Sequence, residues 1–200
     1  MTTGGAGRRI VLATANPDKA REISDALAGL AVELIPRPAS VPDVDESGAT
    51  LLENARLKAY ALRAATGEDA LADDTGLEVD ALGGAPGVHS ARYAGEPANP
   101  TNNIARLLRE LDGVAPNERT ARFVTVALAR FVDGREVVTR GEVEGTITVE
   151  PSGGAGFGYD PVFRPREGDG RTFAEMGPEE KHALSHRGRA FRALAAALGD

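Results

Sequence analysis

Ala70-Leu71-Ala72-Asp73-Asp74-Thr75-Gly76-Leu77-Glu78-Val79 is the stretch that decides the fold. Its first three residues are apolar, and its end alternates apolar and acidic residues, so we expect strand on either side of an acidic turn. In α/β proteins, ligands bind in the crevice outside strand ends. An aspartate there can hold a divalent cation or take a proton from water. Asp-Thr-Gly is also ordinary turn composition, and the turn alone favours that simpler interpretation.

The N-terminal segment predicts a strand followed by a helix. Residues 9–14 are largely apolar and indicate a buried first strand, after which Asn16-Pro17 supplies an N-cap and a first helical residue. Free N–H groups at such a helix start favour an anion, and Lys19 adds a positive charge. No GxxxxGK[ST] pattern is present. A plain strand-helix unit with a solvated lysine explains the segment equally well.

An acidic loop precedes the clearest helix of the sequence. Residues 32–35 predict a second strand, three prolines then favour an extended loop that carries Glu46, and residues 49–66 show helical spacing of apolar residues. An acid beside a helix start usually complements the helix dipole. A metal role needs a second carboxylate, for which Asp74 is the candidate. Asn54 and Lys58 lie four residues apart and share one helix face, so Lys58 could point into a cleft.

The remainder of the chain predicts a β-rich middle and a helical end. Residues 101–111 have the spacing of an amphipathic helix, and Asp133-Gly134 predicts a hairpin between strands at 120–132 and 136–149. We expect the second of these strands to break near Gly141 and Gly145. Ser185 is positioned to cap a last helix that ends at Leu198.

A second group of polar and aromatic residues follows the hairpin. Phe157 and Tyr159 stand between glycines, which let a ligand approach the backbone closely. An aromatic ring there can stack on a flat ligand ring, and Asp160 can accept hydrogen bonds from it. A bulge with core aromatics is the alternative. Further along the chain, the donors suited to carbonyl or phosphate oxygens are Lys181, His186 and Arg187.

Bulk composition restricts the class of protein. The 200 residues fit one domain, 1–200, with residues 1–7 expected as a disordered tail. A net charge of −7 argues against nucleic-acid binding, and the absence of cysteine excludes disulfides and thiol catalysis. No apolar run approaches the roughly 20 residues of a membrane span. We therefore expect a cytoplasmic location with neither nucleic acid nor membrane as partner.

Six short motifs occur in order along the chain. The six motifs are Thr14-Ala-Asn-Pro-Asp-Lys19, Glu46-Ser-Gly-Ala-Thr50 with Glu53-Asn54, Asp73-Asp-Thr-Gly-Leu77, Leu82-Gly-Gly-Ala-Pro-Gly87, Phe157-Gly-Tyr-Asp-Pro161, and Lys181 with Ser185-His-Arg-Gly188. Each motif alone is weak, but the ordered set resembles the inosine/xanthosine triphosphate pyrophosphatase family over residues 9–198. Ala15 and Thr75 stand where many members carry Gly and Ser.

The resemblance implies a fold, an activity and a set of site residues. The fold would be an elongated α/β one, a mixed sheet with flanking helices and two lobes around a central cleft, in a homodimer. The enzyme would be Mg²⁺-dependent and would hydrolyse deaminated purine nucleoside triphosphates (ITP, dITP, XTP) to the monophosphate and pyrophosphate. Asp74 would be the proton acceptor and, with Glu46, a metal ligand. Phosphate and base would be bound by Thr14, Ala15, Asn16, Asp18, Lys19 and Thr75, and by Phe157, Gly158, Tyr159, Asp160, Lys181, His186 and Arg187.

The residue chemistry agrees with that assignment. A cation on two carboxylates, together with Lys19 and a helix start, would offset the charge of a triphosphate. One carboxylate can hardly be both a ligand and a free base, so Asp73 is an alternative for one of these tasks. Donors from His186 or Arg187 match the 6-oxo group of hypoxanthine and xanthine, which is an acceptor. Adenine has an amino donor at that position, so it would leave a protein donor unsatisfied. Guanine shares the oxo group, and the sequence does not identify what rejects it.

Two other hypotheses remain. A Maf-like pyrophosphatase would have a related fold and prefer other nucleotides, including modified pyrimidines. A non-enzymatic nucleotide sensor would bind ITP without turnover and without need of Mg²⁺, although carboxylates beside a triphosphate argue against it.

Overall fold

A computed structural model describes residues 8–199 as a mixed α/β protein, as the sequence predicts. Within these residues, seven strands form one sheet in the order β2-β1-β3-β5-β6-β7, and β4 pairs with β3. The chain divides into two compact units. One contains the chain up to Asp74, Val126–Arg140 and the chain from Ala190, and the other contains Thr75–Thr125 and Gly141–Arg189. The single domain over 1–200, the elongated shape and the cleft stay predictions. The expected tail at 1–7 lies outside the described residues.

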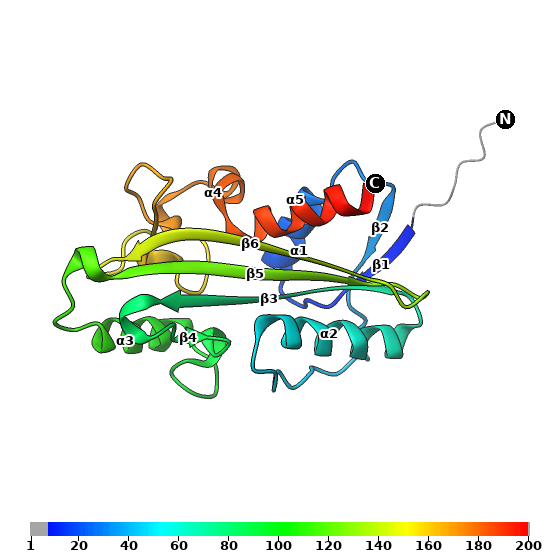
Figure 1. Cartoon of the computed structure of the whole chain (residues 1–200), viewed down its shortest axis with the longest axis horizontal. Helices are drawn as coiled ribbons and strands as arrows, with labels where there is room; N and C mark the ends of the chain where they lie inside the picture. The colour runs from blue at the N-terminus through cyan, green and yellow to red at the C-terminus, as the bar shows by residue number, and fades with distance from the viewer. Residues whose placement is uncertain (1–7, 200) are drawn as a thin grey trace. The chain divides into compact units, whose positions relative to one another are not determined.

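The first unit has helices on both faces of its part of the sheet. Strand β1 (Arg8–Leu12) is parallel to β2 (Val32–Ile35) and to the start of β3 (Asp69–Val79). Figure 1 shows α2 (Leu51–Thr66) on one face and both α1 (Pro17–Ala26) and α5 (His186–Gly199) on the other. The core beneath α1 and α5 is apolar, and its largest fully buried members are Ile10, Ile23, Leu71, Phe131 and Phe191.

Local signals fix the ends of α2. Thr50 is the N-cap, and its side chain accepts a hydrogen bond from the Glu53 N–H. The Glu53 carboxylate in turn accepts the Ala49 N–H at 2.7 Å, so two otherwise unpaired donors at the helix start are satisfied. Gly67 ends the helix with a φ of 72°, a conformation that glycine adopts at little cost. The helix predicted from residue 49 thus begins two residues later.

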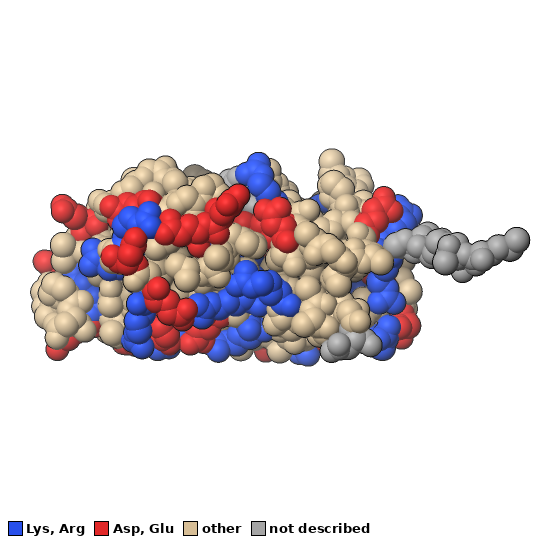
Figure 2. Space-filling model, turned by 90° about the horizontal axis from the view of Figure 1, so that it is seen from above, with Lys and Arg blue, Asp and Glu red and all other residues tan. Residues whose placement is uncertain are grey.

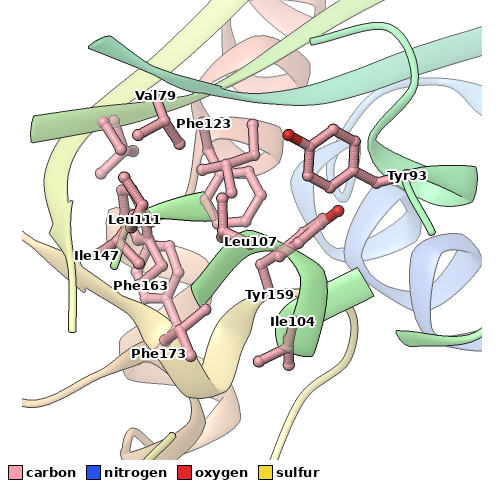
Figure 3. Packing of buried hydrophobic residues seen from close by; sticks show 14 of the residues in the cluster. Val79, Tyr93, Ile104, Leu107, Leu111, Phe123, Ile147, Tyr159, Phe163 and Phe173 are labelled. Carbon is pink, nitrogen blue, oxygen red and sulfur yellow. The ribbon is translucent and has the colours of Figure 1, made fainter. Parts of the chain in front are cut away.

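The second unit has its own aromatic core. Its strands are the end of β3, β4 (Pro86–Gly87), the start of β5 (Thr120–Arg130), the end of β6 (Glu136–Ile147) and β7 (Phe163–Pro165). Helix α3 (Pro100–Glu110) places Ile104 and Leu107 against this core, where Phe123 contacts the Phe163 ring at 4.7 Å between centroids (Figure 3). Helix α4 (Pro178–Leu184) and short helical turns complete the unit.

Two sequence-based expectations about strands are wrong. Residues 73–76 are not a turn, because β3 continues unbroken from Asp69 to Val79. Pairing with neighbouring strands overrides local turn composition there, and Asp73 and Asp74 become buried sheet residues. Strand β6 is likewise unbroken at its glycines. Gly145 lies against β7, where a Cβ atom would approach the Phe163 ring to 2.6 Å, so the glycine permits close strand packing and does not end the strand.

The surface carries both signs of charge. Over the described residues of the face in Figure 2, acidic and basic side chains are interspersed. Between residues 8 and 199, no helix has the length and apolar character to cross a bilayer.

Candidate functional site

The loop after β1 forms one wall of a cavity in the first unit. Thr14 Oγ1 accepts the Asn16 N–H at 3.1 Å, and Asn16 Oδ1 accepts the Lys19 N–H at 3.3 Å, so Asn16 caps α1 as predicted. The cavity measures about 270 Å³. Its polar lining consists of Thr14, Asn16, Lys19, Arg37, Asp43, Glu46, Lys58 and Asp73.

A half-buried lysine, Lys58, joins the two acids that the sequence singles out. Lys58 Nζ donates to Asp74 Oδ1 at 2.7 Å and to Glu46 Oε1 at 3.2 Å. Lys58 comes from α2, Asp74 from β3 and Glu46 from the loop before α2. Strand β1 pairs with β3 only as far as Leu71, so Asp74 lies just beyond the carboxyl end of β1. This is the edge at which α/β sheets bind ligands, although β3 itself does not end there.

Burial and charge oppose each other in this cluster. Burial raises the pKa of Asp74 above its ordinary value, and the Lys58 ammonium partly counters that rise. For Lys58, burial lowers the pKa, but Asp74, Asp73 and Glu46 together raise it above its ordinary value. Lys58 is therefore held as a cation among carboxylates, and Asp74 is a more basic carboxylate than an exposed aspartate.

The acid cluster suits a hard divalent cation. No group of three or more His, Asp or Glu arranged to hold a metal ion occurs within residues 8–199. The oxygens of Glu46 and Asp74 nevertheless converge on one positive charge, the Lys58 ammonium. Mg²⁺ commonly takes one or two carboxylates and completes its shell with water and substrate phosphates. The donor set present fits that pattern.

The second unit holds a separate buried ion pair beside an aromatic ring. Asp160 Oδ2 accepts the Lys181 ammonium and the Phe157 N–H, each at 2.7 Å. The Lys181 ammonium also lies 4.5 Å from the centre of the Phe157 ring, and the Arg187 guanidinium lies 5.5 Å from it. Four of the predicted base-site residues thus form one cluster. Phe157 is its half-buried member, and Gly158 lies beside it in the same turn.

The other residues predicted to bind the base differ in their surroundings: some lie in the cluster, and Tyr159 lies in the hydrophobic core. Arg187 is 2% exposed and donates to Thr75 Oγ1 at 3.3 Å. The His186 ring stacks on Phe123, with 4.5 Å between centroids. Tyr159 belongs to the hydrophobic core, where its hydroxyl donates to the Ser90 carbonyl oxygen. The Tyr159 ring is therefore a core aromatic, which was the alternative interpretation of this stretch of sequence. Of the two aromatic residues, Phe157 is the one that could stack on a ligand ring.

A family model described as the Ham1 family matches residues 10–197. The chain belongs to the Ham1 family. One relative, the dITP/XTP pyrophosphatase of Geobacillus kaustophilus, is 51% identical over 94% of this chain and 92% of its own. Another, the dITP/XTP pyrophosphatase of Streptomyces coelicolor, is 48% identical over 93% and 94% of the two chains. The solved Ham1 protein from Coxiella burnetii has a TM-score of 0.89 and 41% identity, covering 96% of this chain and 98% of that one.

Sequence reasoning missed part of the polar lining of this Ham1 chain. The sequence placed Lys58 on a shared face with Asn54 but assigned neither residue a role. Their spacing on one helix face was the available signal. Arg37 gave no signal, because it stands among prolines in an irregular loop. The side chain of Asp18 lies outside the described part of the chain, and Ala15 lines the cavity through an exposed position.

Proposed function

We propose that this Ham1-family chain is an enzyme that hydrolyses deaminated purine nucleoside triphosphates such as ITP, dITP and XTP. The products are the nucleoside monophosphate and pyrophosphate, and the reaction removes these nucleotides from the nucleotide pool. The observation that carries the proposal is the convergence of Glu46 and Asp74 on Lys58, beside a cavity lined by the 14–19 loop. The names of the relatives support the same substrate class.

Proton transfer is assigned to Asp74. A water oxygen bonds to the α-phosphorus, the bond to the α–β bridging oxygen breaks, and the water proton passes to the carboxylate. Because its pKa is raised by burial, Asp74 accepts a proton more readily than an exposed aspartate does. Asp73, which is buried and lines the cavity of the first unit, is the alternative base if Asp74 serves only as a ligand.

Charge on the phosphates is offset by the cations of the first unit. Lys19 and Lys58 both line the cavity, and the capped start of α1 presents backbone N–H groups. Mg²⁺ is the proposed cofactor, with Glu46 and Asp74 as its protein ligands. When bound, it would supply further positive charge to the phosphate oxygens and to the pyrophosphate that leaves.

The purine ring is assigned to the cluster in the second unit. Phe157 offers a ring face, and Lys181, His186 and Arg187 offer donors suited to a 6-oxo group. Thr75, which follows Asp74 directly in the chain, accepts a hydrogen bond from Arg187 of this cluster. Against adenine, whose 6-amino group is a donor, one of these buried donors would be left unpaired, which disfavours ATP.

A nucleotide panel with one variant tests the proposal. We expect dITP, ITP and XTP to be hydrolysed with release of pyrophosphate in the presence of Mg²⁺, and Asp74→Asn to lower kcat by about 10²- to 10⁴-fold while the circular dichroism spectrum is unchanged. Pyrophosphate is detected as phosphate after addition of inorganic pyrophosphatase. Preferential turnover of dTTP or UTP would favour the Maf-like alternative, and tight ITP binding without turnover would favour a sensor.

The proposed dimer follows from the family resemblance, and the proposed location and the exclusion of nucleic acid and membrane follow from composition. We propose a homodimer in the cytoplasm, with neither nucleic acid nor membrane as a partner. Light scattering coupled to size-exclusion chromatography checks the mass, for which the expected value is twice the 20.8 kDa of one chain.

A further inference from the structure

We propose that Asn54 is the residue that positions the two acids of the site relative to each other. The inference rests on the proposed function. Asn54 lies on α2 and is 0% exposed, and no role follows for it from charge or nucleophilicity. It contacts Asp74 directly and the backbone of the loop that carries Glu46.

The orientation of the Asn54 amide is fixed by its surroundings. Its Oδ1 accepts the backbone N–H of Gly48 at 2.8 Å. Only the oxygen of the amide can accept from a backbone donor, so the nitrogen must face the other way. There Nδ2 donates to Asp74 Oδ2 at 3.2 Å. The side chain is thus a directional link from the loop to the acid on β3.

The link complements the one made by Lys58. Asp74 Oδ1 accepts from Lys58 and Oδ2 accepts from Asn54, so both oxygens of the carboxylate have fixed partners and its plane is set. Glu46 stands two residues before Gly48 in the same loop. Holding Gly48 against α2 therefore restrains Glu46 as well, and a cation or substrate meets acids that are already placed.

Gly48 is shaped for this contact. A Cβ atom on Gly48 would lie 2.7 Å from Asn54 Oδ1 and 2.7 Å from Glu53 Cβ. Either neighbour would have to move, and Asn54 has no free space because it is completely buried. Gly48→Ala therefore disturbs the loop end of the link, while the amino acids of α2 and both acids stay the same.

The second unit provides a matched control. Asn103 is 3% exposed, its Oδ1 accepts the Ala94 N–H at 2.7 Å, and its Nδ2 donates to the Ala91 carbonyl oxygen at 2.9 Å. It is a buried asparagine that ties a loop to a helix, as Asn54 does, but it hydrogen-bonds to backbone atoms of Ser90, Ala91 and Ala94. Loss of Asn103 costs stability without touching a carboxylate.

The test compares Asn54→Ala, Gly48→Ala and Asn103→Ala with the wild type. Two quantities are measured: kcat and KM for dITP, and Mn²⁺ binding without nucleotide, followed by the paramagnetic signal of the free ion. We expect Asn54→Ala and Gly48→Ala each to lower kcat or weaken Mn²⁺ binding by about 10- to 100-fold. KM should change less than kcat. Asn103→Ala should lower the melting temperature and leave both quantities unchanged.

The outcomes separate the inference from the proposed function. Wild-type kcat and Mn²⁺ affinity in folded Asn54→Ala would overturn the inference, as would equal losses in Asn103→Ala. If Asn54→Ala does not fold, Gly48→Ala decides in the same way. If the wild type hydrolyses no nucleotide but binds Mn²⁺, the proposed function fails and the binding comparison alone decides the role of Asn54. A wild type that does neither overturns both.

Discussion

At the scale of single residues, the burial of Asp74 has a consequence for the pH dependence of the reaction. A general base acts only when deprotonated, so activity is present above its pKa and is lost as the pH falls through it. Burial raises the pKa of Asp74 above its ordinary 3.8 in the metal-free protein, so at low Mg²⁺ concentration the acid limb of kcat/KM should lie above that value. Lys58 opposes the rise, so Lys58→Gln should move the limb to still higher pH. Rates for dITP across the acidic range check both expectations. A limb that moves downward in Lys58→Gln would contradict this electrostatic account.

The choice between lysine and arginine is also informative at this scale. Of the 23 Lys and Arg residues, only Lys19, Lys58 and Lys181 are lysines. Lys19 and Lys58 line the cavity of the first unit, and Lys181 pairs with Asp160 in the second. A compact ammonium fits beside a buried carboxylate such as Asp74 or Asp160, whereas a planar guanidinium needs a wider space. Lys181→Arg should therefore lower kcat/KM for dITP by about tenfold or more. Arg192→Lys, at an exposed position of α5, is the control and should behave as the wild type.

At the scale of elements, local signals predicted some boundaries and failed at others. Asn16-Pro17 and residues 49–66 contain their own caps and apolar spacing, so α1 and α2 could be predicted from the sequence. The stretch 73–76 could not, because its conformation is decided by strand pairing that its own composition opposes. Within the site, too, some features could be predicted from local sequence and others could not. Motif acids such as Asp74 stand out in the sequence, whereas the contact of Asn54 with Asp74 depends on how a helix lies on a strand.

The packing of β7 on β6 gives a prediction at this scale. A Cβ atom on Gly145 would lie 2.6 Å from the Phe163 ring and would also clash with the Arg164 carbonyl oxygen. Gly145→Ala should therefore lower the free energy of unfolding by about 1–3 kcal/mol. Gly154→Ala is the matched control, since no heavy atom lies within 4 Å of a Cβ there. Urea denaturation measures both variants. Equal stabilities would show that the two strands separate at little cost.

At the scale of the whole molecule, three strands are shared by the two compact units. The unit boundaries fall inside β3, β5 and β6, each of which has residues on both sides of its boundary. A continuous strand cannot lose its pairing in one half without exposing unpaired backbone groups at the junction. We therefore expect the units to unfold together, in keeping with the prediction of one domain.

Matched core variants test this cooperativity. Leu194 lies in the core of the first unit and Leu107 in that of the second, and both are 0% exposed. Replacing either by alanine should cost about 2–5 kcal/mol and shift a single transition of the whole chain. Far-ultraviolet circular dichroism reports all helices, and tyrosine fluorescence weights the second unit through the buried Tyr93 and Tyr159. In both variants the two signals should change at the same urea concentration. If Leu194→Ala shifts only the circular dichroism transition, the units unfold independently, and the shared strands do not couple them.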